Sequence, residues 1–132
     1  MSNSYAMTFT ALTAHIDELG HVNNTVWVQW IQEIATAHWQ AVAPPENLAS
    51  YVWVVTRHEI DYRGNIGLGE SVAAETSIPG PPRGAQFDRC VVFRDARGKA
   101  IVTARSTWAL LDRASGRLCR VRPEIAASFY AA

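Results

Sequence analysis

The sequence predicts an α+β domain in which a five-stranded antiparallel sheet wraps around one long central helix. One segment without Gly or Pro, residues 24–41, repeats its apolar residues at helical spacing. One strand-like segment precedes it and four follow, and the later links are of hairpin length, which favours antiparallel neighbours. A sheet wrapped around the helix buries both, so we expect a single domain over residues 1–132.

The amino-terminal part of the chain predicts a strand, a loop and the helix, in that order. Residues 5–12 are rich in β-branched and aromatic side chains with loose alternation, which is typical of a strand. Residues 13–24 form a polar loop. The surface of the following helix is apolar almost all round, which indicates burial on most sides. Asn23 or Asn24 suits its amino-terminal cap, and Pro44-Pro45 prevents its continuation.

The rest of the chain predicts four strands separated by turns rich in Gly, Pro and Asp. We expect these strands at residues 51–63, 71–78, 86–94 and 100–111. Residues 117–122 suit a short extension, and Pro123 opens a short final helix. The sheet edges and remaining apolar rows need cover, so we expect a homodimer or a tetramer of dimers.

Composition excludes several classes of function. The formal net charge is zero and Lys99 is the only lysine, which gives no support to nucleic-acid binding. Two cysteines outside CxxC spacing do not predict a disulfide framework. No signal-peptide pattern and no apolar stretch approaching the ~18 residues of a membrane helix are found, so we expect a cytoplasmic protein without membrane contact.

The segment that carries chemistry comes immediately before the helix. It places a carboxylate, a glycine, an imidazole and two carboxamides within eight residues, Asp17-Glu18-Leu19-Gly20-His21-Val22-Asn23-Asn24. The amino end of a helix presents unpaired amide hydrogens and a partial positive charge. It can therefore hold an anionic ligand or a developing oxyanion.

These residue types suit thioester hydrolysis. The carbonyl oxygen gains negative charge and needs fixed donors, of which the backbone amide of Asn24 is the best candidate. The Asp17 carboxylate can act as general base toward water or as nucleophile through an anhydride, and both routes stay open. The leaving thiolate has a pKa around 8.5, by analogy with a cysteine thiol, and needs little acid assistance.

The pattern D-x-x-G-H-V-N-N, followed by Trp30 and Glu33, resembles the hotdog-fold thioesterases of the 4-hydroxybenzoyl-CoA thioesterase type. The D-x-x-x-H-V-N-N version is similar to the signature of acyl-carrier-protein thioesterases. Residues 57–62 and 69–72 resemble the family's second and third strands, and residues 117–129 resemble its terminal segment. The resemblance thus covers nearly the whole chain and implies a hotdog fold.

The resemblance implies roles for individual residues. Asp17 matches the catalytic carboxylate, and Asn24 matches the position whose amide holds the thioester oxygen. Trp27 stands where the family usually has tyrosine, so that hydroxyl is lost and the indole is a candidate to fill acyl space. Glu33 is the second candidate carboxylate, since some members use a helix glutamate. If buried, it needs a partner such as Arg57.

Other polar residues have two interpretations each. His21 either orients the loop or polarises water and Asp17, and Asn23 either caps the helix or contacts substrate. Arg83, in a Pro-Gly loop, is a candidate contact for a CoA phosphate. His15 and His38 lack partners at metal-ligand spacing, so we expect no metal and no organic cofactor.

The sequence therefore predicts an enzyme that hydrolyses small acyl-CoA or acyl-carrier-protein thioesters. The acyl chain is expected to enter beside the amino end of the helix, near the subunit contact. Two alternatives stay open. One is a hotdog dehydratase, in which His21 would act with an acidic partner. The other is a non-catalytic module that binds acyl thioesters without turnover.

Overall fold

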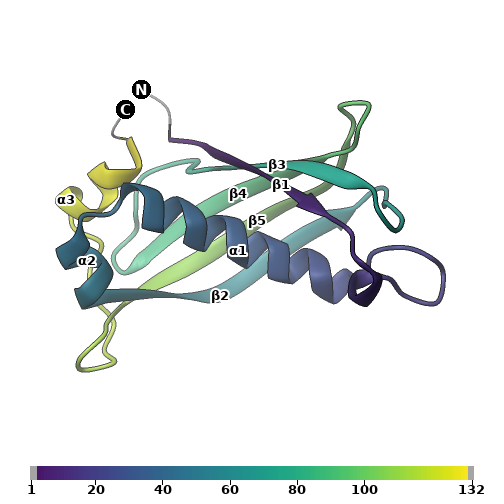
Figure 1. Cartoon of the computed structure of the whole chain (residues 1–132). Coiled ribbons are helices and arrows are strands. Elements are labelled where there is room, and N and C mark those ends of the chain that lie inside the picture. The colour runs from purple at the N-terminus through teal and green to yellow at the C-terminus, as the bar shows by residue number, and fades with distance from the viewer. Residues whose placement is uncertain (1–2, 131–132) are drawn as a thin grey trace.

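The computed structural model describes residues 3–130 and confirms the predicted architecture, with a five-stranded antiparallel sheet and one long helix packed against it (Figure 1). The sheet order is β1-β3-β4-β5-β2, so β1 and β2 form its two edges. The strands are β1 (Tyr5–Thr10), β2 (Tyr51–Tyr62), β3 (Ser71–Ser77), β4 (Gln86–Arg94) and β5 (Ala100–Asp112).

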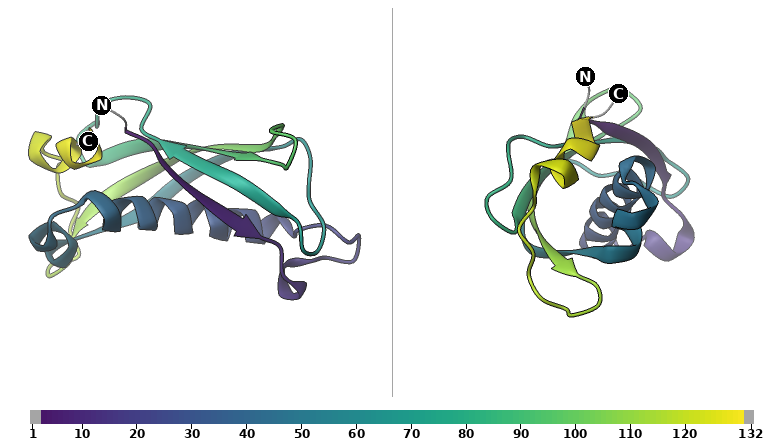
Figure 2. Two further views of the ribbon diagram at one scale, coloured as in Figure 1. Left: turned by 45° about the horizontal axis from the view of Figure 1, so that its top comes forward. Right: turned by 90° about the vertical axis from the view of Figure 1, so that its left-hand side faces the viewer.

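The central helix α1 (Asn24–Val42) lies in the curved face of the sheet, which bends around it (Figure 2). Asn23 caps the helix, as expected, because its side chain accepts a hydrogen bond from the backbone amide of Thr25. The buried face consists of Val26, Trp27, Trp30, Ile31, Ile34, Ala35, His38 and Trp39. The other face of α1 is exposed, so the helix is buried on fewer sides than its apolar sequence predicts.

Three short segments differ from expectation. The prolines end α1 as predicted, but Pro45 also opens a second helix, α2 (Pro45–Ser50), since proline is tolerated at a first helical position. Residues 117–122 form no strand, but an isolated bridge joins Leu118 to Leu111, and the amides of Cys119 and Val121 donate to other segments. A 3-10 turn, η1 (Thr13–His15), interrupts the first loop.

The expected final helix is α3 (Pro123–Ala126), which continues as the 3-10 turn η2 (Ala127–Tyr130). Both pack at the end of the molecule that holds α2, opposite the loop before α1 (Figure 1). Within the described part of the chain, no helix is long and apolar enough to cross a membrane.

The interior contains two apolar clusters. The first lies around the amino-terminal half of α1 and includes Phe9, Val22, Trp27, Trp30, Ile31, Phe93 and Val102. The second lies between the carboxyl end of α1 and the last helix and includes Trp39, Ile78, Phe87, Leu110, Ile125 and Phe129.

A layer of buried and half-buried polar side chains separates these clusters. Arg89 of β4 lies opposite Ser106 of β5, and Ser106 lies opposite His58 of β2. Nδ1 of His58 and Oγ of Ser106 are 2.6 Å apart, and Arg89 donates to Oγ1 of Thr76 at 3.0 Å. His38 of α1 belongs to the same layer, because its Nδ1 accepts a hydrogen bond from Arg89. The sequence pattern did not reveal this layer, because each residue belongs to a different element.

Candidate active site

The loop before α1 is held in a tight turn by Asp17. Its backbone amide donates to the carbonyl of His21 at 2.8 Å. Its Oδ1 accepts from the amides of Leu19 at 2.9 Å and His21 at 3.2 Å. Oδ2 accepts no hydrogen bond from the described residues. One carboxylate oxygen therefore shapes the loop, and the other is available for chemistry.

The same loop is anchored by Asn65, from the turn after β2. Oδ1 of Asn65 accepts from the amides of Val22 and Ile66, and Nδ2 donates to the carbonyl of Val22. Because Val22 immediately precedes the cap residue Asn23, this clamp fixes where α1 begins. In the sequence, Asn65 lies in a predicted turn between two strands, and nothing in its local pattern indicates the contact.

The amino end of α1 leaves one backbone amide without a partner. Asn23 accepts from the amide of Thr25 through its side chain and from the amide of Val26 through its carbonyl, both at 2.9 Å. The amide of Asn24 has no acceptor among residues 3–130. Nearby, the hydroxyl of Tyr62 donates to the carbonyl of Asn24 at 3.4 Å. An unpaired amide therefore lies at the end of a 19-residue helix, where negative charge is stabilised.

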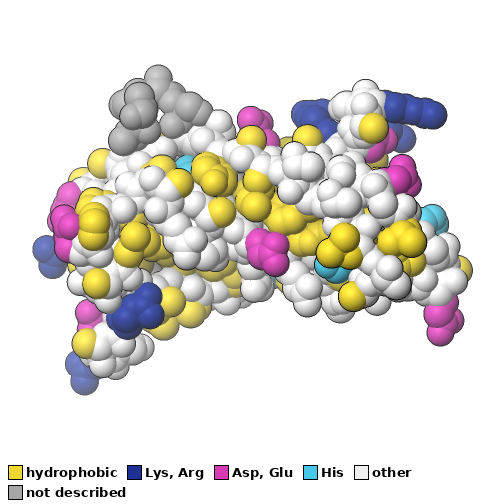
Figure 3. Space-filling view, viewed as in Figure 1, with side chains coloured by type: hydrophobic (Ala, Val, Ile, Leu, Met, Phe, Trp, Pro, Cys, Tyr) yellow, Lys and Arg dark blue, Asp and Glu magenta, His cyan; other side chains and the backbone are white. Residues whose placement is uncertain are grey.

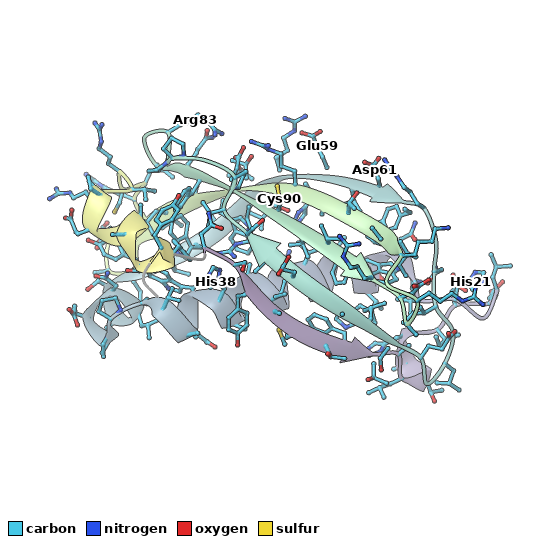
Figure 4. All side chains as sticks on the ribbon, turned by 90° about the horizontal axis from the view of Figure 1, so that it is seen from above. His21, His38, Glu59, Asp61, Arg83 and Cys90 are labelled. Atoms are coloured by element: carbon cyan, nitrogen blue, oxygen red, sulfur yellow. The ribbon has the colours of Figure 1, made fainter. Side chains whose placement is uncertain are left out.

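His21 and Glu33 lie apart from this amide. His21 is exposed in the loop at one end of the molecule, far from His38 (Figure 4). Glu33 is exposed on the outer face of α1, beside a shallow hollow lined by helix residues. It is not buried and needs no counter-ion. Arg57 pairs with Glu59 instead, at 3.0 Å, so the expected Arg57 partnership is wrong.

Trp27, a candidate to fill acyl space, is fully buried in the first cluster. It packs edge-on against Trp30 and Phe93, with both ring centroids 5.1 Å away. Its indole N–H has no acceptor among the described residues. Trp27 thus has the environment of a core residue.

Arg83 is engaged in an ion pair, its Nη2 lying 3.1 Å from Oδ1 of Asp88. The same carboxylate accepts from Arg105 and Thr107. Burial alone would raise the pKa of Asp88, but the hydrogen bonds from Arg83, Arg105 and Thr107 lower it to about 2. Arg83 stays half exposed, so part of its guanidinium is open to other anions.

A cavity of about 280 Å³ lies at the other end of α1, between that helix and β2, β4 and β5. Its wall contains several large aromatic side chains, among them Trp39, Trp53, Phe87, Trp108 and Phe129. From the sequence, the acyl chain is expected beside the amino end of α1. The described cavity instead follows the carboxyl-terminal half of the helix.

Comparison with known proteins decides the family. The acyl-ACP thioesterase N-terminal domain family matches residues 2–129. The chain belongs to this family. The finding confirms the resemblance to hotdog thioesterases drawn from the loop motif. Among curated protein sequences, no relative matches the chain.

Solved structures confirm the fold of this family domain. A Lactobacillus plantarum protein assigned as an oleoyl thioesterase matches with a TM-score of 0.86 at 19% identity, over 99% of this chain and 52% of that one. An acyl-ACP thioesterase from Bacteroides thetaiotaomicron gives 0.77 at 23%, over 89% and 49%. The chain thus spans about half the length of both. A DHNA-CoA thioesterase from Staphylococcus aureus gives 0.83 at 13%, over 96% and 89%.

In this thioesterase-family domain, a buried cation lies beside the cavity. Arg89 lines the cavity and is 5% exposed. Its Nη1 donates to Nδ1 of His38 at 2.8 Å and to Oγ1 of Thr76 at 3.0 Å, and its guanidinium lies over the Phe129 ring at 5.2 Å. Burial lowers the pKa of Arg89 to about 10, so it stays charged at neutral pH. In the sequence, Arg89 stands at alternate positions with Phe87 and Val91 along β4, and this pattern indicates that its side chain points into the core.

His38 should make the stability of the domain depend on pH. Burial, and then the charge of Arg89, lower the pKa of His38 to about 4. Its stabilising effect is fully present above the unfolded-state pKa of about 6.5 and is lost as the pH falls toward 4. Chemical denaturation should show a loss of up to about 3 kcal/mol across this range. His38→Gln should remove most of the loss, whereas His21→Gln, at an exposed site, should retain it.

Proposed function

We propose that this chain hydrolyses acyl-CoA or acyl-carrier-protein thioesters to a free acid and a thiol. The observation that carries the proposal is the unpaired amide of Asn24, which follows the Asp17 loop at the amino end of α1. The family membership and the thioesterase names of the structural neighbours support the same chemistry.

In the proposed reaction, the Asn24 amide binds the thioester oxygen and stabilises the charge that develops on it. Asp17 either takes a proton from water, which attacks the carbonyl carbon, or attacks that carbon itself. The first route breaks the carbon–sulfur bond in a tetrahedral intermediate and releases acid and thiolate. The second forms an acyl-Asp17 anhydride that water then hydrolyses. In both, the thiolate gains a proton from solvent.

The remaining site residues have supporting roles in this proposal. His21 orients the loop or polarises the attacking water, and Asn23 holds the first turn of the helix. Glu33 is the second candidate for the catalytic carboxylate. It is exposed on α1 and would face a second subunit packed against that helix. The half-exposed guanidinium of Arg83 is proposed to contact a phosphate of the CoA or carrier arm.

A second hotdog unit belongs to the proposal, most simply in a homodimer or a tetramer of dimers. At 1.5 Å per residue, α1 rises about 17 Å from Asn24 to Ala35, the first helix residue that lines the cavity, and this distance separates the Asp17 loop from the cavity. An antiparallel partner helix would bring a loop of one copy toward the cavity of the other. The face that carries α1 exposes hydrophobic atoms along its middle (Figure 3), and the edge strand β2 exposes Val54.

A cytoplasmic location is also proposed. Cys90 and Cys119 are both unpaired, as is usual in a reducing compartment.

The test is thiol release from a panel of acyl-CoAs and matching acyl-carrier proteins, with short, medium, long and aromatic acyl groups. We expect turnover of at least one substrate. The carrier, CoA or carrier protein, whose thioester gives the higher kcat/KM identifies the natural class of substrate. If neither carrier gives turnover although thioesters bind, the chain is a binding module. If a β-hydroxyacyl thioester loses water without thiol release, it is a dehydratase.

A further inference from the structure

The cavity at the carboxyl end of α1 contains more positive charge than its walls neutralise. Three charged residues line it: Asp88, Arg89 and Arg113. The carboxylate of Asp88 is already paired with Arg83 and Arg105. The side chain of Asp88 also lies on the opposite face of β4 from that of Arg89, because successive side chains of a strand alternate between its faces. Asp88 therefore does not neutralise Arg89.

Arg89 itself keeps free donors. A guanidinium has five N–H groups, and only Nη1 of Arg89 makes hydrogen bonds to residues 3–130, to His38 and Thr76. The groups on Nε and Nη2 have no acceptor in that part of the chain. Both partners of Nη1 are neutral, because the lowered pKa leaves His38 uncharged at pH 7. No described carboxylate lies within ion-pair distance of Arg89.

Burying a charge without a counter-ion is costly, and the cost falls when an anion occupies the adjoining space. We propose that the cavity binds a small carboxylic acid group on an apolar body, with its carboxylate on Arg89 and its body against the aromatic wall. A guanidinium suits this ligand because it can grip both carboxylate oxygens.

The size of the cavity limits the ligand. At about 30 Å³ for a group the size of water, 280 Å³ accommodates about nine such groups. Benzoate has this size and a ring that suits a wall containing Trp39, Trp53 and Phe129. The carboxylate can come from two sources, a free acid or the far end of a carboxyacyl thioester. The second source rests on the proposed function, and the first does not.

The primary experiment is calorimetric titration of the wild-type protein with benzoate and with benzamide, which has the same shape and no charge. We expect benzoate to bind at least tenfold more tightly. Arg89→Gln should abolish this preference. Arg94→Gln removes the same charge from an exposed site on the same strand and should retain it. Equal binding of the two probes by the wild type, or no binding of benzoate, overturns the proposal without needing any variant to fold.

A second variant locates the binding. Thr36 is exposed at the cavity and lies on a regular turn of α1, so Thr36→Trp should fold and fill the space. It should weaken benzoate binding at least tenfold while Arg89 stays in place. Unchanged affinity in this variant would put benzoate elsewhere and overturn the assignment.

Hydrolysis rates distinguish the two sources of the carboxylate, a free acid and the far end of a carboxyacyl thioester. A preference of at least tenfold in kcat/KM for adipoyl-CoA over hexanoyl-CoA, lost in Arg89→Gln, assigns the carboxylate to the far end of the acyl group. Benzoate binding without this preference assigns it to a free acid, as product or effector. If no thioester is hydrolysed, the proposed function fails, while the benzoate result still decides this inference.

Discussion

Replacing Asp17 with asparagine should reduce kcat for thiol release by about a hundredfold or more, within the range of a lost general base. The substitution keeps an oxygen that can accept from the amides of Leu19 and His21, so the loop should retain its shape. It removes the charge and the basicity of the second oxygen. The measurement is steady-state hydrolysis of the best substrate in the panel, with circular dichroism to verify the fold.

The matched control is Glu18→Gln, which removes an exposed carboxylate from the adjacent position of the same loop. It should change kcat less than about threefold, because an exposed carboxylate outside the site contributes nothing to proton transfer. Should Asp17→Asn retain full activity, the carboxylate role passes to Glu33, and Glu33→Gln becomes the decisive variant.

Trp27→Ala should lower the free energy of unfolding by about 3–5 kcal/mol, the cost of truncating a large buried aromatic residue. The indole is fully enclosed by the first cluster, where it contacts Trp30 and Phe93. Its removal leaves a cavity beside these two rings, which adds to the lost burial of the indole. Urea unfolding followed by circular dichroism measures the loss independently of the change in tryptophan fluorescence.

Trp27→Phe is the companion variant and should cost less than half as much. Phenylalanine keeps most of the packing and removes an indole N–H that has no described acceptor. The opposite outcome, unchanged stability of Trp27→Ala with a shift of the preferred substrate to longer acyl chains, would return Trp27 to the wall of the acyl site.

Local sequence patterns were sufficient to predict the elements that dominate the fold. Alternation located all five strands, and helical spacing located α1 and left its cap between Asn23 and Asn24, of which Asn23 is the cap. The loop motif with Asp17 and Asn24 was visible because its residues are adjacent in sequence. Pro45 shows the limit of such reasoning, since one residue both ends a helix and suits the start of another.

The rest of the site depends on contacts between distant segments, which no local pattern contains. Asn65 clamps Val22 across 43 positions, and Arg89 meets His38 across 51. The cavity likewise needs walls from three strands and two helices. Burial of Arg89 was implied by its alternation with Phe87, but its lack of a carboxylate partner becomes apparent only when every neighbour is known.

The polar layer between the two apolar clusters has a consequence for local unfolding. Cooperative units in proteins tend to follow continuous apolar packing, and here that packing is interrupted across the sheet at Arg89, Ser106 and His58. The end that contains α3 and η2 holds the smaller of the two clusters, so we expect it to open at a lower free energy than the end that supports the Asp17 loop. In hydrogen exchange, amides near Phe129 should lose protection before those near Val102. Opening at this end of the molecule, where the cavity lies, would then leave the opposite end folded.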